Sequence, residues 1–540
     1  MALSFYFYNQ QRFHFLDSAV PRRLNICLIN PKFEPSYWGF DYALPLYPGN
    51  VKCTMVTGAL AHLAALVPGH QVCLLDENVE PIDFDFLERF DLVGVTGMNV
   101  QKERMREILQ ELRRREIFTV VGGAYASVDE HYFDGLCDVL FCGEADETWP
   151  KFVGQFAAGK LFDNFYKQAQ PTDMTKLPTP RFDLLKVKRY ATGSIQFSRG
   201  CPFQCEFCDI IVTFGRRPRM KRPEQVIEEL EQMRKLGFLG AFIVDDNFIG
   251  NKKAAKELLR MIVSWQKQHE YPLRLNTEAS INLADDPELL ELMYEANFRA
   301  VFIGIETPRA ASLKETKKFQ NVAGDSLEAK LSRVQNAGLD ISAGFIVGFD
   351  NDDEAIFEDQ YRFIQNNGIV LAMTGMLTAI PKTPLYERLQ KQGRLRLHDV
   401  NCNFVPQQMS PEQLLDGYSK LLRRLYAPEA FFERYFKIYQ HPEFRRRRAA
   451  IIAKAGENNI LRTLAYGLIL AWNLFWTLVK EKRLQAVGHV YWRFFWRQRR
   501  LYQKGIVGFT QFVNRCVTHW HFYKFTCEAT AGKLRLFNSG

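Results

Sequence analysis

The chain has 540 residues, and this length predicts two or three domains because a single hydrophobic core rarely grows so large. Hydrophobic residues make up 47% of the chain and charged residues 24%, which is typical of a globular protein and argues against extended disorder. The formal net charge is +9, and basic residues crowd the last hundred positions, so we expect an anionic surface as a partner.

The N-terminal residues 1–15 are apolar but carry no basic n-region and no small-residue cleavage site, so no secretory signal is expected. The eleven cysteines of the chain show no regular pairing pattern. They indicate a reducing compartment, in which thiols stay free for metal binding or catalysis. Together these features predict a cytoplasmic protein.

From residue 24 to residue 165, short apolar runs alternate with runs of helical periodicity. This alternation predicts a parallel sheet with helices on both faces, a Rossmann-like fold that binds flat cofactors beyond the carboxyl ends of its strands. Residues 166–193 are polar, contain prolines and show no sustained period, so we assign them to a linker. The strands are expected at 24–30, 71–76, 91–97, 118–123 and 138–144.

A second α/β alternation occupies residues 194–395. Six strands, separated by helical patterns, predict a partial (β/α)6 barrel with its functional side chains at the carboxyl ends of the strands. The fold class is therefore α/β, followed by an α-helical C-terminal domain over residues 396–540. The barrel strands are expected at 194–198, 241–245, 273–278, 300–305, 341–347 and 370–376.

Two stretches of the C-terminal region are unusual. Residues 463–479 carry no charge, but they fall short of the roughly 20 apolar residues that a spanning helix needs and include Asn473. A buried helix, an interfacial helix and a membrane span therefore all remain open. In residues 491–500 aromatic and arginine residues interleave, which is typical of a membrane-surface helix or of an amphipathic helix packed on the barrel.

The stretch RGCPFQCEFCDI (199–210) places Cys201, Cys205 and Cys208 directly after the first expected barrel strand. Three thiolates at this spacing can hold three irons of a 4Fe–4S cluster and leave the fourth iron open to a ligand. The alternatives are a zinc knuckle or buried thiols, but tetrahedral zinc takes four protein ligands and no fourth cysteine or histidine lies nearby. The motif therefore indicates an iron–sulfur cluster.

This motif resembles the CxxxCxxC signature of radical S-adenosylmethionine (SAM) enzymes. In that family SAM chelates the open iron, and its reductive cleavage gives a 5′-deoxyadenosyl radical that abstracts hydrogen from an unactivated carbon. The resemblance implies that SAM-binding residues follow the later barrel strands, although a helix cap or a salt bridge remains the alternative for each carboxylate. The implied residues are Asp245, Asp246, Asn247, Glu278, Ser280, Gly304, Glu306, Gly344 and Gly348.

Residues 24–165 resemble the cobalamin-binding domain that a large branch of this family carries. The implied glycines let the backbone lie against the corrin, and the polar side chains bind its amides or its nucleotide tail. In DENVEP (76–81), Asn78 stands where histidine-ligating domains have the histidine of DxHxxG, so the resemblance implies a His-off cobalamin. The implied cobalamin residues are Asn78, Thr96, Gly97, Asn99, Gln101, Gly122 and Gly123.

Nearly the whole chain resembles the subfamily of class B radical methyltransferases that includes the hopanoid C-2 methylase, through phrases such as GMNVQ, CEFCDI, VDDNFIGNKKAA and FIGIETP. The resemblance implies methylation of an inert carbon in a hopanoid or another isoprenoid lipid, with two SAM molecules consumed. It also implies a reducing partner such as flavodoxin or ferredoxin. The composition of the C-terminal region also indicates peripheral contact of the protein with the inner face of the cytoplasmic membrane.

Three other functions stay open. A radical SAM cyclase or rearrangement enzyme acting on a pigment or isoprenoid would keep the radical step without methyl transfer. An RNA methylthiotransferase would need a second cluster on N-terminal cysteines, but VVGGAY (120–125) has no cysteine in its glycine turn and no β-rich RNA-binding module follows. Nucleic acid is therefore not an expected partner. A cobalamin or iron–sulfur sensor would bind the cofactors without cleaving SAM.

Overall fold

The structure is a computed structural model that describes residues 21–396, 402–454, 460–501 and 506–534. Residues 1–15, on which the expectation of no secretory signal rests, lie outside the described residues. The chain divides into two compact units. The first combines Met1–Lys32 with Thr57–Leu185, and the second combines Phe33–Val56 with Lys186–Gly540.

The first unit is built on a six-stranded parallel sheet with the strand order β3-β1-β4-β5-β6-β7. Its central strands are buried along almost their whole length, as expected for a parallel sheet that helices cover on both faces. The strands are β1 (Asn25–Asn30), β3 (Gln71–Asp76), β4 (Leu92–Thr96), β5 (Thr119–Gly122), β6 (Val139–Cys142) and β7 (Phe165–Lys167).

Helices of this unit form where apolar residues recur every three or four positions. In α4 (Lys102–Arg114), Met105, Ile108, Leu109 and Leu112 form one buried stripe, and charged residues cover the other face. Burial of each such side chain contributes about 1.5–3 kcal/mol. The other helices are α2 (Gly58–Ala65), α3 (Phe84–Leu87), α5 (Ala124–Val128) and α6 (Thr148–Ala157), with 3-10 turns η2 (Asn99–Gln101), η3 (Glu130–Phe133), η4 (Met174–Lys176) and η5 (Phe182–Leu184).

The second unit contains a seven-stranded parallel sheet of order β15-β14-β13-β12-β11-β8-β2, which forms a partial barrel. Along β12, β13 and β14, fully buried residues under the helices alternate with half-buried residues on the concave face. The strands are β2 (Cys53–Met55), β8 (Tyr190–Ile195), β11 (Gly240–Ile243), β12 (Arg274–Glu278), β13 (Phe298–Glu306), β14 (Asp340–Val347) and β15 (Leu371–Met376), with a separate antiparallel ribbon of β9 (Ser198–Arg199) and β10 (Arg219–Met220).

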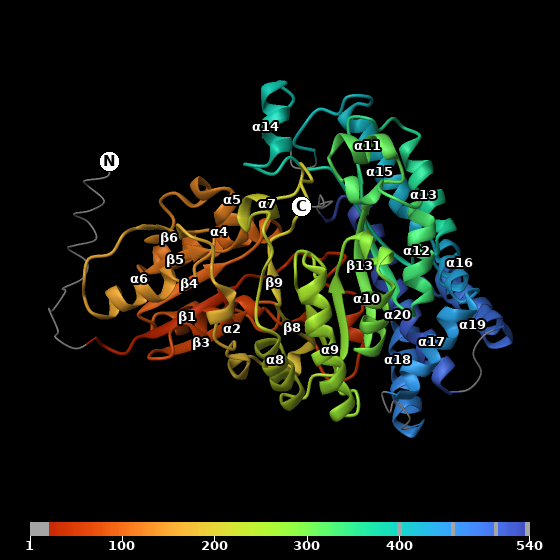
Figure 1. Ribbon diagram of the computed structural model, residues 1–540, viewed down its shortest axis with the longest axis horizontal. Coiled ribbons are helices and arrows are strands. Elements are labelled where there is room, and N and C mark those ends of the chain that lie inside the picture. The colour runs from red at the N-terminus through yellow and green to blue at the C-terminus, as the bar shows by residue number, and fades with distance from the viewer. Residues whose placement is uncertain (1–20, 397–401, 455–459, 502–505, 535–540) are drawn as a thin grey trace. The chain divides into compact units, whose positions relative to one another are not determined.

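Helices connect the barrel strands, and the C-terminal helices gather along one side of the barrel (Figure 1). The connecting helices are α7 (Ile210–Thr213), α8 (Pro223–Lys235), α9 (Lys252–Gln268), α10 (Pro287–Glu295), α11 (Ala310–Glu315), α12 (Leu327–Asn336), α13 (Ile356–Asn366) and α14 (Pro384–Lys391). The C-terminal helices are α15 (Pro411–Leu425), α16 (Pro428–Ile438), α17 (Pro442–Lys454), α18 (Ile460–Lys480), α19 (His489–Leu501) and α20 (Ile506–Thr530). Short turns of this unit are η1 (Leu44–Leu46), η6 (Val187–Arg189), η7 (Ile281–Asp285), η8 (Phe319–Asn321) and η9 (Leu484–Gly488).

The predicted fold class is confirmed, and each of the six expected barrel strands overlaps an observed one. Three stretches differ from the expected boundaries. β7 and the first half of β8 fall in or beside residues 166–193, which we assigned to a linker. Residues 33–56, assigned to the first domain, supply β2, which pairs with β8 in the barrel sheet. β2 is a three-residue edge strand, and its partner β8 is far away in the sequence. No local hydrophobic periodicity therefore predicts it.

Among the described residues, one helical stretch, Thr463–Lys480, is long and apolar enough by length and composition to cross a membrane. Only 22% of this stretch is buried. The sequence left a buried helix, an interfacial helix and a span open, and this low burial counts against a helix that is buried on all sides.

We predict that Gly123→Ala destabilises the first unit. Gly123 has φ of 97° and ψ of −173°, a region that only glycine adopts easily, and an added Cβ would lie 2.3 Å from Thr96 Oγ1. The matched control is Gly143→Ala, where φ is +76° but nothing lies within 4 Å of an added Cβ. The control should cost about 1–2 kcal/mol, and Gly123→Ala at least about 1 kcal/mol more. Hydrogen exchange of peptides covering β4 and β5 measures this difference, and equal losses would contradict it.

Candidate cluster and cofactor sites

The cysteine loop, residues 201–208, leaves the barrel directly after β8 and β9. Gly200 precedes it with φ of +92°, and an added Cβ there would lie 3.0 Å from the carbonyl oxygen of Gly215. Cys205 is buried, with 7% of its surface exposed, and Cys201 and Cys208 are half-buried. The backbone N–H of Cys208 donates to the carbonyl of Cys205 at 3.2 Å, which closes the loop on itself.

The three thiols form one electrostatic group. Burial raises the pKa of Cys201 and of Cys208; the Cys205 thiol raises both further, and the Cys201 thiol also raises that of Cys208. Thiolates in such a site therefore need positive charge, which bound iron supplies. No three His, Cys, Asp or Glu side chains in the described part of the chain surround a single metal ion. A cluster does not need that arrangement, because each thiolate binds its own iron. The donor set fits a 4Fe–4S cluster.

Asp245 and Asp246 follow β11 and hold the backbone that enters the cysteine loop. Asp245 is buried, and its carboxylate accepts hydrogen bonds from the backbone N–H groups of Phe197 (2.7 Å) and Ser198 (2.9 Å) and from Ser198 Oγ (2.7 Å). Asp246 accepts from the N–H of Gly200 at 2.7 Å. Burial raises the pKa of Asp245 to about 7 and that of Asp246 to about 6. Both carboxylates therefore anchor the backbone before the cysteine loop, and their predicted SAM-binding role stays a prediction.

Asn247 and Ser280 come from different strand ends and meet beside the first cysteine. Asn247 Nδ2 donates to Cys201 Sγ at 3.8 Å and to Ser280 Oγ at 3.1 Å, and Asn247 Oδ1 accepts from the N–H of Ser280 at 3.2 Å. Glu278 ends β12 on the concave face and is half-buried. Burial, together with the negative charges of the neighbouring aspartates, raises the pKa of Glu278 to about 8. The SAM-binding role of these three residues stays a prediction.

Glu306 and Lys318 form a buried ion pair beside the cysteine loop. Glu306 ends β13 at a register shift and has φ of +64°, a strained conformation for a residue other than glycine. An added Cβ at Gly304 would lie 2.7 Å from Lys318 Nζ, so the glycine makes room for the pair. Desolvation lowers the pKa of Lys318, but Glu306 and the thiols of Cys205 and Cys208 outweigh it and raise that pKa overall. Sequence reasoning found Glu306 and missed Lys318.

Gln320 is a second residue that sequence reasoning missed. Its Nε2 donates to Cys205 Sγ at 3.7 Å, while its buried Oε1 has no hydrogen-bond partner among the described residues. Asn321 lies next to it and donates through Nδ2 to the carbonyls of Gly304 (3.1 Å) and Ile305 (2.9 Å). Both residues belong to η8, which follows α11, and no strand-end pattern in the sequence marks them.

Gly344 lies within β14, and Gly348 follows the last residue of that strand. An added Cβ at Gly344 would lie 3.0 Å from the ring of Phe302, so this ring covers the glycine. Gly348 has φ of +106°, and its N–H donates to Asp352 Oδ2 at 3.0 Å. The backbone at both glycines therefore lies close to other groups. Their predicted role in SAM binding stays a prediction.

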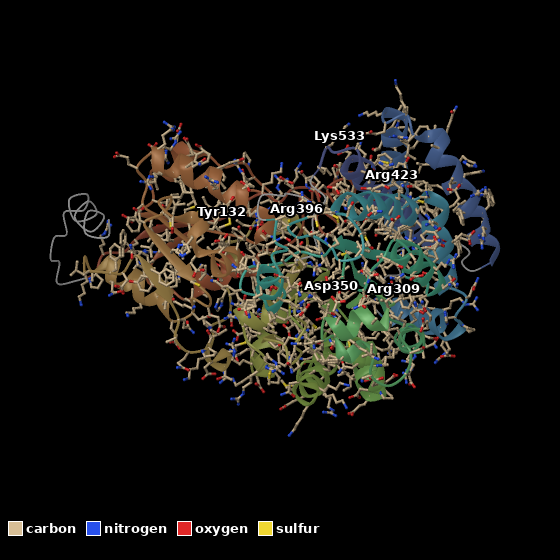
Figure 2. The ribbon with its side chains drawn as sticks, turned by 90° about the horizontal axis from the view of Figure 1, so that it is seen from above. Tyr132, Arg309, Asp350, Arg396, Arg423 and Lys533 are labelled. Carbon is tan, nitrogen blue, oxygen red and sulfur yellow. The ribbon has the colours of Figure 1, made fainter. Side chains whose placement is uncertain are left out.

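The cysteine loop is also tied to α14 by charge. Glu206, between the second and third cysteines, is buried, and its carboxylate accepts from Arg388 at 2.5 Å. Arg388 pairs on its other side with Asp350, which is labelled in Figure 2. The carbonyl of Glu206 accepts from the N–H of Leu385 at 2.9 Å. Leu385 and Arg388, in the segment PLYERL (384–389) after the last barrel strand, thereby hold the cysteine loop.

An aromatic group lines the concave face of the barrel. Trp38 comes from residues 33–56, which we call the strap, and 45% of its surface is exposed. Its ring centroid lies 5.2 Å from that of Phe302 on β13 and 6.4 Å from that of Phe242 on β11. Since β12 lies between these two strands, Trp38 reaches across the concave face. The resulting wall is apolar and adjoins the glycine surface under Phe302.

In the first unit a buried polar cluster occupies the carboxyl ends of β1 and β3. Gln101 Nε2 donates to Asn30 Oδ1 at 2.9 Å and to the carbonyl of Pro31 at 2.5 Å. Asn78 Nδ2 donates to Asp76 Oδ1 at 2.6 Å and to the same carbonyl at 3.2 Å. Two of the predicted cobalamin residues, Asn78 and Gln101, are thus brought together, with their amide donors used inside the protein.

Three of the other predicted cobalamin residues, Thr96, Gly122 and Gly123, line a pocket at the carboxyl edge of this sheet. Thr96 ends β4 and Gly122 ends β5, while Gly97 follows β4 and Asn99 lies exposed on η2, and neither of these two lines the pocket. The pocket has an empty volume of about 450 Å³, including its open mouth. Its lining is largely apolar and comprises Leu28, Leu60, Leu63, Gly94, Val95, Thr96, Val120, Val121, Gly122, Gly123, Phe141, Gly143, Ala145 and Trp149. An apolar pocket beyond parallel strands fits a flat aromatic group such as the base of a nucleotide tail.

Two known protein families match parts of this chain. Residues 195–364 match the radical SAM superfamily, and residues 383–534 match a domain of unknown function, DUF4070. The barrel and its cysteine loop therefore define a radical SAM enzyme.

Two curated relatives match most of the chain. An uncharacterised methyltransferase of Synechocystis sp. is 39% identical over 76% of this chain and 78% of its own length. The hopanoid C-2 methylase of Rhodopseudomonas palustris is 34% identical over 86% of this chain and 87% of its own length. The chain belongs to the family of cobalamin-dependent radical SAM methyltransferases that contains the hopanoid C-2 methylase.

A solved structure shares the fold. The cobalamin-dependent SAM radical enzyme OxsB, with aqua-cobalamin and SAM bound, matches 96% of this chain and 82% of its own, with a TM-score of 0.58 and 15% identity. The predicted architecture of an α/β cofactor domain followed by a radical SAM barrel is thereby confirmed at the level of the fold.

We predict that Glu278 makes the cofactor-free protein less stable as the pH rises. Its pKa is about 8 in the folded chain and 4.5 ordinarily, so between these values the folded state holds a proton that the unfolded chain has lost. The free energy of unfolding then falls by up to about 1.4 kcal/mol per pH unit. Glu278→Gln should flatten the fall in unfolding temperature between pH 5 and pH 8. If the unfolding temperature of the variant changed by the same amount at every pH, groups other than Glu278 would cause the fall.

Proposed function

We propose that this protein is a cobalamin-dependent radical SAM C-methyltransferase that methylates an unactivated carbon of a hopanoid or another isoprenoid lipid. The observation that carries the chemistry is the cysteine loop at the rim of the barrel, which groups three free thiols. The relationship to a hopanoid C-2 methylase over most of the chain supports the lipid class of the substrate.

In this proposal Cys201, Cys205 and Cys208 hold a 4Fe–4S cluster, and the strand ends of the barrel hold SAM. When bound, the cluster and SAM supply a radical that removes hydrogen from the substrate, and cobalamin supplies the methyl group. Asn247 positions the first cysteine through its 3.8 Å contact with the sulfur. The proposed SAM residues are Asp245, Asp246, Asn247, Glu278, Ser280, Gly304, Glu306, Gly344 and Gly348, and Asp245 also anchors the backbone before the cysteine loop.

Lys318 and Gln320 would complete the surroundings of the cluster. Lys318 supplies a buried positive charge that offsets the charge of the thiolates. Gln320 donates to the Cys205 sulfur, and hydrogen bonds to cluster sulfurs are one of the means by which a protein sets a reduction potential. An external reductant such as flavodoxin or ferredoxin would deliver the electron.

The apolar pocket of the first unit would hold the nucleotide tail of a His-off cobalamin. Thr96, Gly122 and Gly123, which line this pocket, would hold the group together with Gly97 and the exposed Asn99. Asn78 is not poised as a cobalt ligand, because its side-chain amide donates to Asp76 and to the carbonyl of Pro31. Gln101 supports the same turn through its bonds to Asn30 and Met98.

The aromatic wall formed by Trp38, Phe242 and Phe302 favours an apolar ring system as substrate. No charged side chain is part of the wall, so a hydrocarbon gains free energy by leaving water, roughly 25 cal/mol per Å². A lipid substrate in turn makes contact with a membrane necessary, and we propose that the protein acts as a cytoplasmic enzyme at the inner face of the cytoplasmic membrane.

The alternative is a radical SAM cyclase or rearrangement enzyme, because the wall accepts other flat apolar molecules equally well. The deciding experiment incubates anaerobically reconstituted enzyme with SAM, cobalamin, a reductant and a hopanoid, followed by mass spectrometry. A product heavier by one methylene, formed together with S-adenosylhomocysteine and 5′-deoxyadenosine, supports the methyltransferase. Formation of 5′-deoxyadenosine with a rearranged product and no S-adenosylhomocysteine would support the alternative.

We predict that Cys205→Ala abolishes cluster binding and SAM cleavage, because two thiolates do not retain the cluster. Iron content and the visible absorbance of the reconstituted protein should fall to background, and 5′-deoxyadenosine should not form. The matched control is Cys137→Ala in the first unit, a half-buried cysteine outside the loop, which should retain both. Full turnover by the Cys205 variant would refute the assignment.

We predict that Trp38→Ala weakens substrate binding without impairing SAM cleavage. Loss of the indole face should lower kcat/KM about tenfold or more, mainly through KM, because a few tens of Å² of apolar contact disappear. Trp38→Phe should restore most of the loss. The rate of 5′-deoxyadenosine formation without substrate should remain that of the unaltered enzyme. An unchanged KM would place the substrate elsewhere.

A further inference from the structure

An unusual share of the exposed apolar surface lies on two C-terminal helices. Of the nineteen large hydrophobic side chains that are exposed among the described residues, ten fall between Leu461 and Trp496. A monomeric protein in water seldom gathers its apolar surface in this way without a partner. The ten are Leu461, Leu468, Ile469, Trp472, Phe475, Trp476, Val479, Leu484, Trp492 and Trp496.

Helix α18 has two apolar stripes on opposite sides. Leu468, Trp472, Phe475, Trp476 and Val479 recur every three or four residues and form the outward stripe, with Trp472 63% exposed. The opposite stripe is formed by Leu470, Leu474 and Leu478, which are buried in the protein. The inward stripe supplies the packing, while the outward stripe stays exposed among the described residues.

The segment that carries the outward stripe is itself almost wholly positive, although Arg493 and Arg497 on α19 pair with Glu429 and Glu433 of α16. Residues 460–501 contain eight lysines and arginines and a single acidic residue, Glu481, which pairs with Lys524 at 2.6 Å. Lys480, Lys482 and Arg483 are exposed directly after the aromatic stripe. Tryptophans next to exposed cations match the boundary of a bilayer, where indole rings sit among the headgroups and cations meet anionic lipid.

We propose that the outward stripe of α18, with Lys480, Lys482 and Arg483 at its end, is a docking surface that inserts into one leaflet of an anionic lipid bilayer. This inference goes beyond the proposed reaction, since it concerns where the protein lies and needs no cofactor. The aromatic side chains enter the headgroup and upper acyl region, and the cations bind lipid phosphates.

Insertion on one side is favoured over a span by the inward contacts of α18. The helix is about 31 Å long, enough to cross a bilayer. Yet Asn473 Nδ2 donates to the carbonyl of Leu46 at 2.9 Å, and Gly467 lies against Phe509 and Thr510 of α20. A spanning helix would have to exchange these contacts for lipid and leave the asparagine without its partner.

The same contact joins the docking surface to the aromatic wall. Leu46 belongs to the strap, and the strap carries Trp38 onto the concave face of the barrel. A lipid leaving the bilayer at α18 would therefore meet the strap before it reaches the wall. The docking surface would shorten the path of an insoluble substrate to the reaction site.

The test measures binding of the full-length protein to vesicles by co-sedimentation, with phosphatidylglycerol and phosphatidylcholine mixed or with phosphatidylcholine alone. Trp472→Ser combined with Trp476→Ser should weaken binding to the mixed vesicles at least tenfold. Lys482→Glu combined with Arg483→Glu should weaken binding to the mixed vesicles and leave the weak binding to phosphatidylcholine unchanged. Leu239→Ser is the matched control, since Leu239 is also 63% exposed but lies before β11, and it should bind as the unaltered protein does.

Circular dichroism confirms that each variant is folded before binding is compared. Equal binding by the tryptophan variant and the control would overturn the proposal. So would a concentration-dependent dimer that the tryptophan variant loses while no vesicle binding is seen, because a second copy would then cover the stripe. Native membranes that keep the protein through alkaline carbonate extraction would indicate a span instead. A protein that docks but does not methylate would refute only the proposed reaction.

Discussion

The site depends above all on one buried carboxylate. Asp245 accepts three hydrogen bonds from Phe197 and Ser198, and these fix the backbone a few residues before the first cysteine. Burial disfavours the charge, as the pKa of about 7 reflects, and the three donors offset much of that cost. Because β11 and β8 are neighbours in the sheet, the carboxylate transfers the rigidity of the barrel to the loop. The anchor therefore sets where the cysteine loop begins.

Around that anchor the protein collects opposite charges that are individually expensive to bury. Glu206 meets Arg388, and Glu306 meets Lys318, so both sides of the cysteine loop carry a paired carboxylate. A buried pair contributes little to stability, but removing one partner leaves a costly unpaired charge. The pairs therefore specify one arrangement of the loop. The left-handed conformation of Glu306 is tolerated for the same reason, since the pair and the register shift in β13 hold it in place.

The sequence predicted the strands and the cysteine loop well because both leave local patterns. Buried parallel strands read as short apolar runs, and the thiol spacing belongs to a known cluster motif. Lys318, Gln320 and Trp38 could not be predicted, because they approach the site from segments with no strand-end pattern and only the tertiary fold brings them there. The strand-end position of Asp245 was predicted, but its hydrogen bonds to Phe197 and Ser198 were not, because they depend on a neighbouring strand that only the fold brings close.

The C-terminal helices are part of the barrel's chemistry through the strap. His521 on α20 donates through Nε2 to the carbonyl of Ser36 at 3.0 Å and accepts at Nδ1 from the N–H of Tyr42, and Phe40 stacks on its ring. Burial lowers the pKa of His521 to about 4, so the ring stays neutral and keeps both bonds at physiological pH. With α18 holding Leu46 and α20 holding the residues on both sides of Trp38, the wall cannot form without the C-terminal helices. The C-terminal helices therefore hold the strap that brings Trp38 onto the concave face of the barrel.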